Sequence, residues 1–194
     1  ADGNFVGGFN PRRNCYEVNI GGVPMVWDEQ KKSWIGGRSY DAEYFGNAGI
    51  DLVSFYNGRL YLHEANTLRN NFYGVQYKSQ VWVPGNWKYG DGSGNVICPK
   101  KIYKAFSERS ETIWDAFEVI NDVGQLTIVD KFRFSKREGI YYAALRRDMN
   151  TVNVLNPIVD GKQMRDNVIL LKLQNDSVEH EWFNNVVINQ IESK

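Results

Sequence analysis

Two successive β-hairpin patterns between residues 25 and 64 constrain the fold of this chain more than any other feature. In the second pattern, Asn57-Gly58 separates LVSFY from RLYLH, and this dipeptide favours a type I′ turn, which needs positive φ at both central residues. In the first, the polar residues 29–32 separate two short segments that each carry a tryptophan, so Trp27 and Trp34 can pair across the strands. We expect the two hairpins to form a four-stranded antiparallel meander, a unit of propeller blades and structural β-modules.

Composition and further strand patterns extend this interpretation to the whole chain. Aromatic residues make up 14% of the 194 residues and 18 are glycines, which is typical of turn-dense β proteins. Residues 39–49 predict a loop or short turn, and the remaining strand patterns occupy residues 16–20, 70–80, 101–108, 113–120, 126–134, 140–145, 168–174 and 183–191. The sequence therefore predicts a mainly β fold of antiparallel hairpins and meanders, propeller-blade-like or sandwich-like, with very little helix.

The strand patterns fall into two modules. Residues 1–15 are polar and rich in glycine, and they predict an extended N-terminal arm without a core of its own. Residues 16–83 predict a β-meander module, residues 84–99 a Gly/Pro-rich loop or boundary, and residues 100–194 a second antiparallel β module. The start at Ala1 is compatible with removal of an initiator methionine, cleavage of a signal peptide or release from a longer precursor.

Charge and hydropathy restrict the possible partners. The 23 basic and 23 acidic residues cancel, so the whole surface has no net attraction for nucleic acid or anionic membranes. Short basic clusters at residues 12–13, 100–101 and 146–147 predict solvated faces or ion pairs rather than sequence-specific reading of nucleic acid. No apolar run approaches the roughly 20 residues of a membrane span.

The two cysteines, Cys15 and Cys98, are far apart in the sequence. A disulfide would need their Cα atoms within about 7 Å, which the sequence does not establish. Two ordinary buried thiols are the expected state, and pairing stays open.

Enzyme motifs are missing from the sequence. It has no P-loop, no GxGxxG after a strand, no nucleophile elbow and no HExxH. Residues 90–94, GDGSG, lack the lysine and helix that follow a phosphate-binding loop. His63 ends a predicted hairpin strand and is expected to be structural. His180 lies between Glu179 and Glu181, and if this segment is a strand, alternation turns the two glutamates to the face opposite His180, so the three side chains would not converge on a metal. We therefore expect no catalytic residue, no cofactor site and no metal site.

A pair of carboxylates distant in sequence is the remaining route to catalysis, because a glycosidase needs only two acids several ångströms apart. The candidates are Asp28, Asp41, Glu43, Asp51, Asp115 and Glu118. Aromatic side chains in predicted strands would suit a sugar platform, but a β core or an inter-subunit contact is the favoured interpretation. These side chains are Trp27, Trp34, Tyr61 and Trp82.

A family resemblance runs from about Val26 through most of the chain and rests on hairpin signatures. Its segments are Trp27-Asp28-Glu29 with Lys32-Ser33-Trp34, Arg38-Ser39-Tyr40 with Tyr44-Phe45-Gly46, residues 55–63 (FYNGRLYLH), residues 138–148 (EGIYYAALRRD), and residues 161–165 with 168–173. They resemble large tail structural proteins, of the nozzle or "muzzle" type, of crAss-like and related short-tailed bacteriophages.

The resemblance implies a non-enzymatic, homo-oligomeric virion subunit of the tail conduit through which DNA leaves. Such proteins are usually far longer, so it also implies a C-terminal fragment of a processed precursor. The implied partners are copies of the chain, the remainder of that precursor, other tail proteins and transiently passing DNA. The alternative is a carbohydrate- or receptor-binding β-module of a phage or bacterial surface protein, and a third possibility is a glycan-cleaving domain that uses an unrecognised carboxylate pair.

Overall fold

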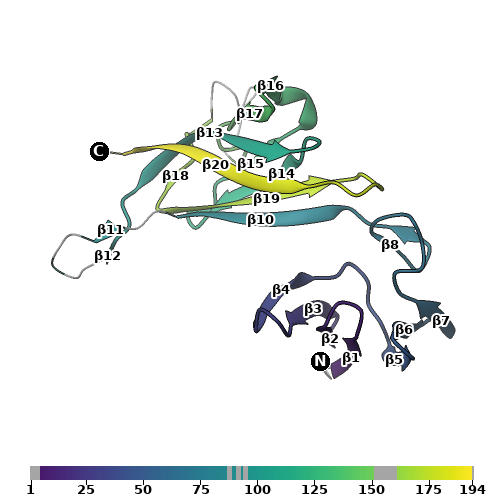
Figure 1. Cartoon of the computed structure of the whole chain (residues 1–194). Helices are drawn as coiled ribbons and strands as arrows, with labels where there is room; N and C mark the ends of the chain where they lie inside the picture. The colour runs from purple at the N-terminus through teal and green to yellow at the C-terminus, as the bar shows by residue number, and fades with distance from the viewer. Residues whose placement is uncertain (1–4, 87–88, 91–92, 94–95, 151–160, 194) are drawn as a thin grey trace. The chain divides into compact units, whose positions relative to one another are not determined.

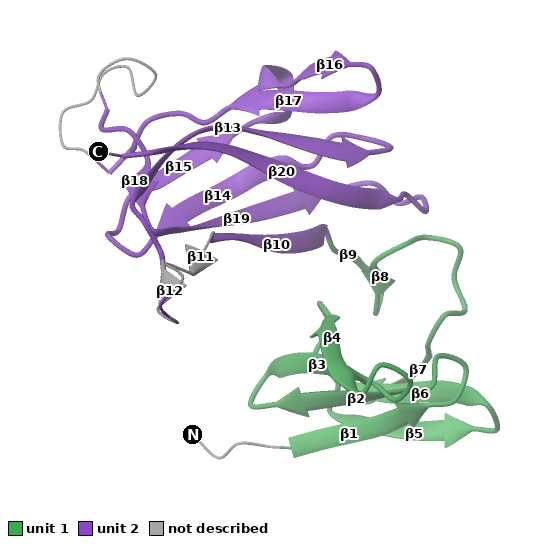
Figure 2. Cartoon of the chain, turned by 60° about the vertical axis from the view of Figure 1, so that its left-hand side comes forward, with its two compact units in different colours: residues 1–77 green, residues 78–194 purple. Residues whose placement is uncertain are grey.

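The computed structural model describes residues 5–86, 89–90, 93, 96–150 and 161–193 (Figure 1). Antiparallel strands form nearly all of its regular structure, so the expected mainly β fold is confirmed. In the described part of the chain, the one helical element is a short 3-10 turn at Lys131–Arg133. The chain divides into two compact units, residues 1–77 and residues 78–194 (Figure 2).

The first sheet of unit 1 is a four-stranded meander in the order β1-β2-β3-β4. Its strands are β1 (Phe5–Asn10), β2 (Cys15–Ile20), β3 (Val23–Asp28) and β4 (Ser33–Gly37). The predicted tryptophan hairpin is β3 and β4, and the rings of Trp27 and Trp34 meet edge to face with centroids 5.4 Å apart. A β-bulge leaves Ile35 between the paired residues Trp34 and Gly36.

The second sheet of unit 1 has the order β5-β6-β7. Its strands are β5 (Tyr44–Ala48), β6 (Asp51–Tyr56) and β7 (Arg59–Leu62), and a short hairpin of β8 (Asn71–Phe72) and β9 (Val75–Gln76) follows. The predicted turn between β6 and β7 is confirmed, with φ of 49° at Asn57 and 69° at Gly58.

Four expectations for unit 1 are wrong. The predicted strand at residues 70–80 is instead the short hairpin of β8 and β9, followed by the start of the next strand at Ser79. The two predicted hairpins do not form one meander, because the connection after β4 buries Tyr40 and Ala42 and leads into a second layer. The predicted arm at residues 1–15 contains β1, which pairs with β2 along its whole length. The predicted loop at residues 39–49 contains β5, which pairs with β6.

Unit 2 consists of two sheets around a common core. The first has the order β10-β19-β14-β15, formed by β10 (Ser79–Asn86), β14 (Asp115–Asn121), β15 (Leu126–Val129) and β19 (Val168–Asn175). The second has the order β16-β17-β13-β18 with β20 also paired to β13, formed by β13 (Lys101–Ser110), β16 (Ser135–Arg137), β17 (Ile140–Ala144), β18 (Arg165–Asp166) and β20 (Phe183–Glu192). Side chains of both sheets, such as Phe106, Val119 and Leu171, form the core.

The boundary between the units lies earlier than expected. The predicted first module, residues 16–83, ends inside β10, which pairs with β19 and therefore belongs to unit 2. Residues 84–86 of the predicted loop are the end of this strand. Beyond them, β11 (Tyr89–Gly90) pairs with β12 (Val96–Ile97), and much of the predicted glycine-rich loop lies outside the described residues.

Candidate interaction surface

One face of the β1-β2-β3-β4 sheet carries a row of aromatic side chains across all four strands. Tyr16 on β2 lies opposite Phe9 on β1 and Trp27 on β3, and Trp27 lies opposite Trp34 on β4. The rings of Phe9 and Tyr16 have centroids 4.9 Å apart. Because directly opposed residues share a face of the sheet, these four side chains form one continuous row.

The remaining positions of this face are also apolar. Val18 lies opposite Gly7 and Met25, and Ile20 lies opposite Phe5 and Val23. We call the nine apolar side chains the open face: Phe5, Phe9, Tyr16, Val18, Ile20, Val23, Met25, Trp27 and Trp34. Exposure reaches 69% at Phe5, 59% at Val23 and 50% at Trp34. Contiguous apolar patches of several hundred Å² are uncommon on soluble monomers, so the open face is the candidate interaction surface of unit 1.

The opposite face of the same sheet is buried and mixes apolar side chains, such as Val26, with polar ones, such as Glu17 and Asn19. Glu17 accepts hydrogen bonds from Arg38, at 3.1 Å from Nη2 to Oε1, and from the hydroxyl of Tyr40. Burial by itself would raise the pKa of Glu17, but the charge of Arg38 and the hydrogen bonds from Arg38 and Tyr40 outweigh it and lower this pKa. Glu17 is therefore a buried, ionised anchor between the sheet and the connection after β4.

This distribution departs from the usual pattern of an antiparallel sheet, because the exposed face is apolar and the buried face carries Glu17 and Asn19 beside Cys15 and Val26. Such a sheet normally turns apolar residues to the core and polar residues to water. Along β2, however, Cys15, Glu17 and Asn19 are buried, whereas Tyr16 and Ile20 are exposed. The sequence analysis missed the part of the open face on β1, although the alternation of Phe5, Gly7 and Phe9 carried a signal for it.

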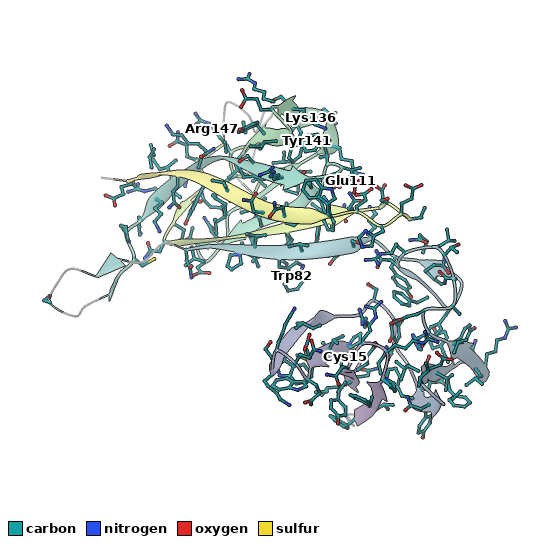
Figure 3. All side chains as sticks on the ribbon, viewed as in Figure 1. Cys15, Trp82, Glu111, Lys136, Tyr141 and Arg147 are labelled. Carbon is teal, nitrogen blue, oxygen red and sulfur yellow. The ribbon has the colours of Figure 1, made fainter. Side chains whose placement is uncertain are left out.

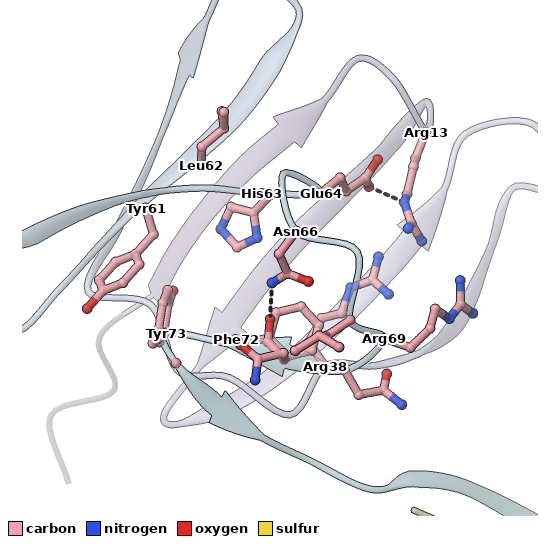
Figure 4. Close-up of a pocket in the computed structure, with 14 residues that line it drawn as sticks. Arg13, Arg38, Tyr61, Leu62, His63, Glu64, Asn66, Arg69, Phe72 and Tyr73 are labelled. Carbon is pink, nitrogen blue, oxygen red and sulfur yellow. Dashed lines mark hydrogen bonds and ion pairs between the residues drawn. The ribbon is translucent and has the colours of Figure 1, made fainter. Parts of the chain in front are cut away.

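Unit 1 also contains a pocket with a volume of about 380 Å³ (Figure 4). It is lined by the end of β7, the segment after it and the β8–β9 turn, with the side chains of Arg13, Arg38, Tyr61, His63, Glu64, Asn66, Arg69, Phe72 and Tyr73 among others. Arg13 forms an ion pair with Glu64, and Nδ2 of Asn66 donates to the carbonyl of Asn71 at 3.0 Å. The sequence showed no sign that these residues share a pocket, because they converge only through the fold.

A serine and a histidine meet beside this pocket. Nε2 of His63 lies 2.7 Å from Oγ of Ser54, which in turn lies 2.8 Å from the hydroxyl of Tyr73. The geometry resembles a nucleophile with its base, but Ser54 has no exposed surface for a substrate to reach. Burial lowers the pKa of His63, and the rings of Tyr40 and His63 have centroids 4.8 Å apart. This arrangement suits a hydrogen-bonded polar core.

The comparisons with known proteins add no family. No protein-family model and no curated protein matches this chain. Within the described residues, no helix is long and apolar enough to cross a membrane. The open face and the pocket are therefore the features of unit 1 that bear on function.

The candidate acids of unit 1 each have a structural partner. Oδ1 of Asp28 accepts the backbone N–H groups of Gln30 and Lys31 in the β3–β4 turn, at 2.8 and 2.9 Å. Glu43 accepts the N–H of Asn57 at 3.0 Å. Asp41 binds the amide of Asn19, and Asp51 pairs with Arg12. These contacts fix turns and connections.

The candidates of unit 2 lie on β14. Asp115 accepts a hydrogen bond from Gln174 at 2.9 Å, and Glu118 pairs with Lys172 at 2.8 Å. Nζ of Lys172 also lies 5.0 Å from the ring centroid of Trp82. Trp82 projects from β10 and is 61% exposed (Figure 3), so it belongs to the surface of this sheet.

His180 does not lie in a strand, so the expectation from alternation does not apply to it. It belongs to the segment between β19 and β20, where Glu181 turns toward Thr112 and Asn175. No group of three or more His, Cys, Asp or Glu side chains in the described ranges could hold a metal ion. That the chain has no catalytic, cofactor or metal site stays a prediction.

Both cysteines are free thiols. Cys15 is buried in unit 1, where burial raises its pKa. Cys98 is half-buried in unit 2, and its Sγ lies 3.5 Å from the carbonyl oxygen of Asn167. Of the predicted basic clusters, the one at residues 12–13 forms ion pairs, as Arg12 binds Asp51 and Arg13 binds Glu64.

Proposed function

We propose that this chain is a structural, non-enzymatic subunit of a larger protein assembly and that unit 1 docks through the open face. The observation that carries this proposal is the β1-β2-β3-β4 sheet, which is held from one face by the Glu17–Arg38 pair and carries nine apolar side chains on the other. Exposed apolar sheet surface is costly in water and invites another surface to cover it. A rigid β-sheet with such a face suits the wall of an assembly better than a site for turnover.

The finer form of the proposal is a subunit of a bacteriophage tail nozzle that lines the DNA-ejection conduit. The resemblance of residues 27–63 and of the later strands to phage tail proteins supports it. The balanced net charge of the chain agrees with a conduit that does not hold the DNA that passes. Rigid antiparallel sheets and apolar docking faces are the features that a closed, repeating wall needs.

Mass spectrometry of gradient-purified virions tests the tail proposal. In a phage that encodes this sequence, peptides of the chain should be found in intact particles and in their isolated tails, and antibodies against the chain should label the tail tip. Virions that lack these peptides would contradict the tail proposal. That result would not bear on the docking role of the open face, which the oligomeric state of the chain tests separately.

A second function, a carbohydrate- or receptor-binding module, is favoured by the pocket of unit 1. Its lining combines the rings of Tyr61 and Phe72 with the guanidinium of Arg69, a combination suited to an acidic sugar. Calorimetry with sialic and uronic acid oligosaccharides tests this function. Binding that Arg69→Ala reduces and Arg59→Ala spares would support it, and no binding at millimolar sugar would contradict it.

A further inference from the structure

We propose that the open face is covered by the open face of a second copy of this chain, sheet against sheet. The inference rests on the proposed docking function and names its partner. Three properties of the open face argue for a second copy: its area, its lack of charge and its relief.

The exposed area of the open face agrees with a dimer. Five of the nine residues are 43–69% exposed and the other four are partly exposed, so with roughly 150–250 Å² for each aromatic side chain and less for each aliphatic one the exposed area is on the order of 600–800 Å². A stable protein interface buries about 800 Å² on each partner. The open face alone therefore supplies most of the area that one copy contributes.

The chemistry of the open face allows it to face itself. None of its nine residues is charged, so two identical faces meet without the like-charge repulsion that opposes most self-association. Its polar groups are the hydroxyl of Tyr16 and the indole N–H groups of Trp27 and Trp34, and aromatic side chains of this kind are typical of interface cores. The charged pair of Arg38 and Glu17 lies on the opposite face of the sheet, so it adds no charge to the open face.

The relief of the open face is self-complementary. Its middle row is Gly7, Val18, Met25 and Gly37, and this row is lower than the flanking rows because two of its four positions are glycines. One flanking row is the aromatic row. Rows on one face lie two residues apart, about 6.8 Å along the strands. The aromatic row of one copy can therefore pack against the middle row of the second copy. The aromatic row of the second copy then packs against the middle row of the first, as a two-fold interface requires.

Introducing a positive or a negative charge at Val18 tests the proposal, because Val18 lies in the middle row of the open face on the inner strand β2. The full chain should sediment as a dimer, and Val18→Lys and Val18→Glu should each weaken dimerisation at least tenfold. An equimolar mixture of the two variants should dimerise more tightly than either variant alone, since the opposite charges of lysine and glutamate then lie in neighbouring rows of the interface and attract each other. Val187→Lys, at an exposed valine of β20 in unit 2, is the matched control and should leave the dimer intact.

A wild-type chain that stays monomeric at about 100 μM, far above the dissociation constant of a stable dimer, would overturn the second-copy inference. So would a dimer that both Val18 variants preserve. If either variant fails to fold, hydrogen exchange of the wild-type chain decides: protection of β1 to β4 should rise with chain concentration, and unchanged protection contradicts the inference. A monomer that binds another tail protein, with the binding lost in Val18→Lys, would overturn the inference and keep the proposed function.

Discussion

At the scale of single residues, Glu108 is a fully buried carboxyl group on β13 that forms no ion pair with the residues that the structure describes. It has no exposed surface, and its Oε1 accepts the backbone N–H of Trp114 at 2.7 Å while its Oε2 has no partner. Burial raises the pKa of Glu108 to about 7, although the hydrogen bonds from Trp114 and Ser110 oppose the shift. The carboxyl is thus protonated in the folded chain at pH values where it is ionised in the unfolded chain.

The pH dependence of stability should reveal this group. Between the usual value of 4.5 and about 7, the folded chain holds a proton that the unfolded chain releases, so the free energy of unfolding falls as pH rises. At 1.36 kcal/mol per pKa unit the loss amounts to about 3 kcal/mol. Glu108→Gln should abolish this slope in urea denaturation and make the chain more stable than the wild type above about pH 8.

The control for this experiment is Glu192→Gln, at an exposed glutamate near the end of β20. It should keep the slope of the wild type. An unchanged slope in Glu108→Gln would show that another group causes the pH dependence.

The buried pair in unit 1 leads to a second prediction at this scale. Glu17→Ala removes the acceptor of Arg38 and Tyr40, and an unpaired buried charge costs about 3–5 kcal/mol. Tyr40→Phe removes one hydrogen bond and should cost about 1–3 kcal/mol. Urea unfolding followed by tryptophan fluorescence measures both. Glu29→Ala, which breaks the exposed pair with Lys32, should change stability by less than about 1 kcal/mol, and an equal loss in this control would contradict the argument.

At the scale of elements, the turn between β6 and β7 fixes the register of its hairpin. Gly58 has φ of 69°, a region that a β-branched residue tolerates badly, so Gly58→Val should cost more than about 1 kcal/mol. Gly46→Ala in β5 is the control, because the added Cβ would meet the nearest atom, of Val53, at 3.6 Å, an ordinary contact. A melting temperature that Gly58→Val leaves unchanged would disprove the role of the turn.

Hairpins with local turn chemistry were predictable from the sequence, and strand partners distant in sequence were not. The β3–β4 and β6–β7 hairpins follow from tryptophan pairing and from Asn57-Gly58. The hairpin of β8 and β9 turns at Tyr73-Gly74, with φ of 56° and 80°, and tyrosine is not a usual residue for positive φ. The pairing of β10 with β19 joins segments about ninety residues apart, and no local pattern encodes it.

At the scale of the whole molecule, the aromatic residues of the candidate surface were predictable, but their common face was not. Alternation places Tyr16, Val18 and Ile20 on one side of β2. Only the second layer of unit 1 determines that this side is exposed. A prediction from hydropathy alone would bury these residues and expose Glu17. Burial of Glu17 depends on its ion pair with Arg38, and Arg38 follows two further strands along the chain.

The last prediction concerns the behaviour of the isolated chain, which we expect to self-associate or precipitate because its open face is made for a partner. A dye that binds apolar surface should bind unit 1, and the amount bound per chain should fall as the chain concentration rises, since association covers the same surface. Replacing Phe5, Val23 and Trp34 by serine, threonine and glutamine should raise solubility several-fold. The melting temperature should change little, because side chains exposed to this extent contribute little to the core.

The matched control replaces Trp82, Val187 and Ile191, three exposed apolar residues of unit 2, in the same way. It should leave dye binding to unit 1 and association unchanged, because these residues do not belong to the open face. If the triple variant of unit 1 behaves like this control, the open face is not the surface that drives association. If the wild-type chain is a monodisperse monomer that binds no dye and unfolds cooperatively, the assembly role itself is wrong, since an apolar sheet face in water must either be covered or bind the dye.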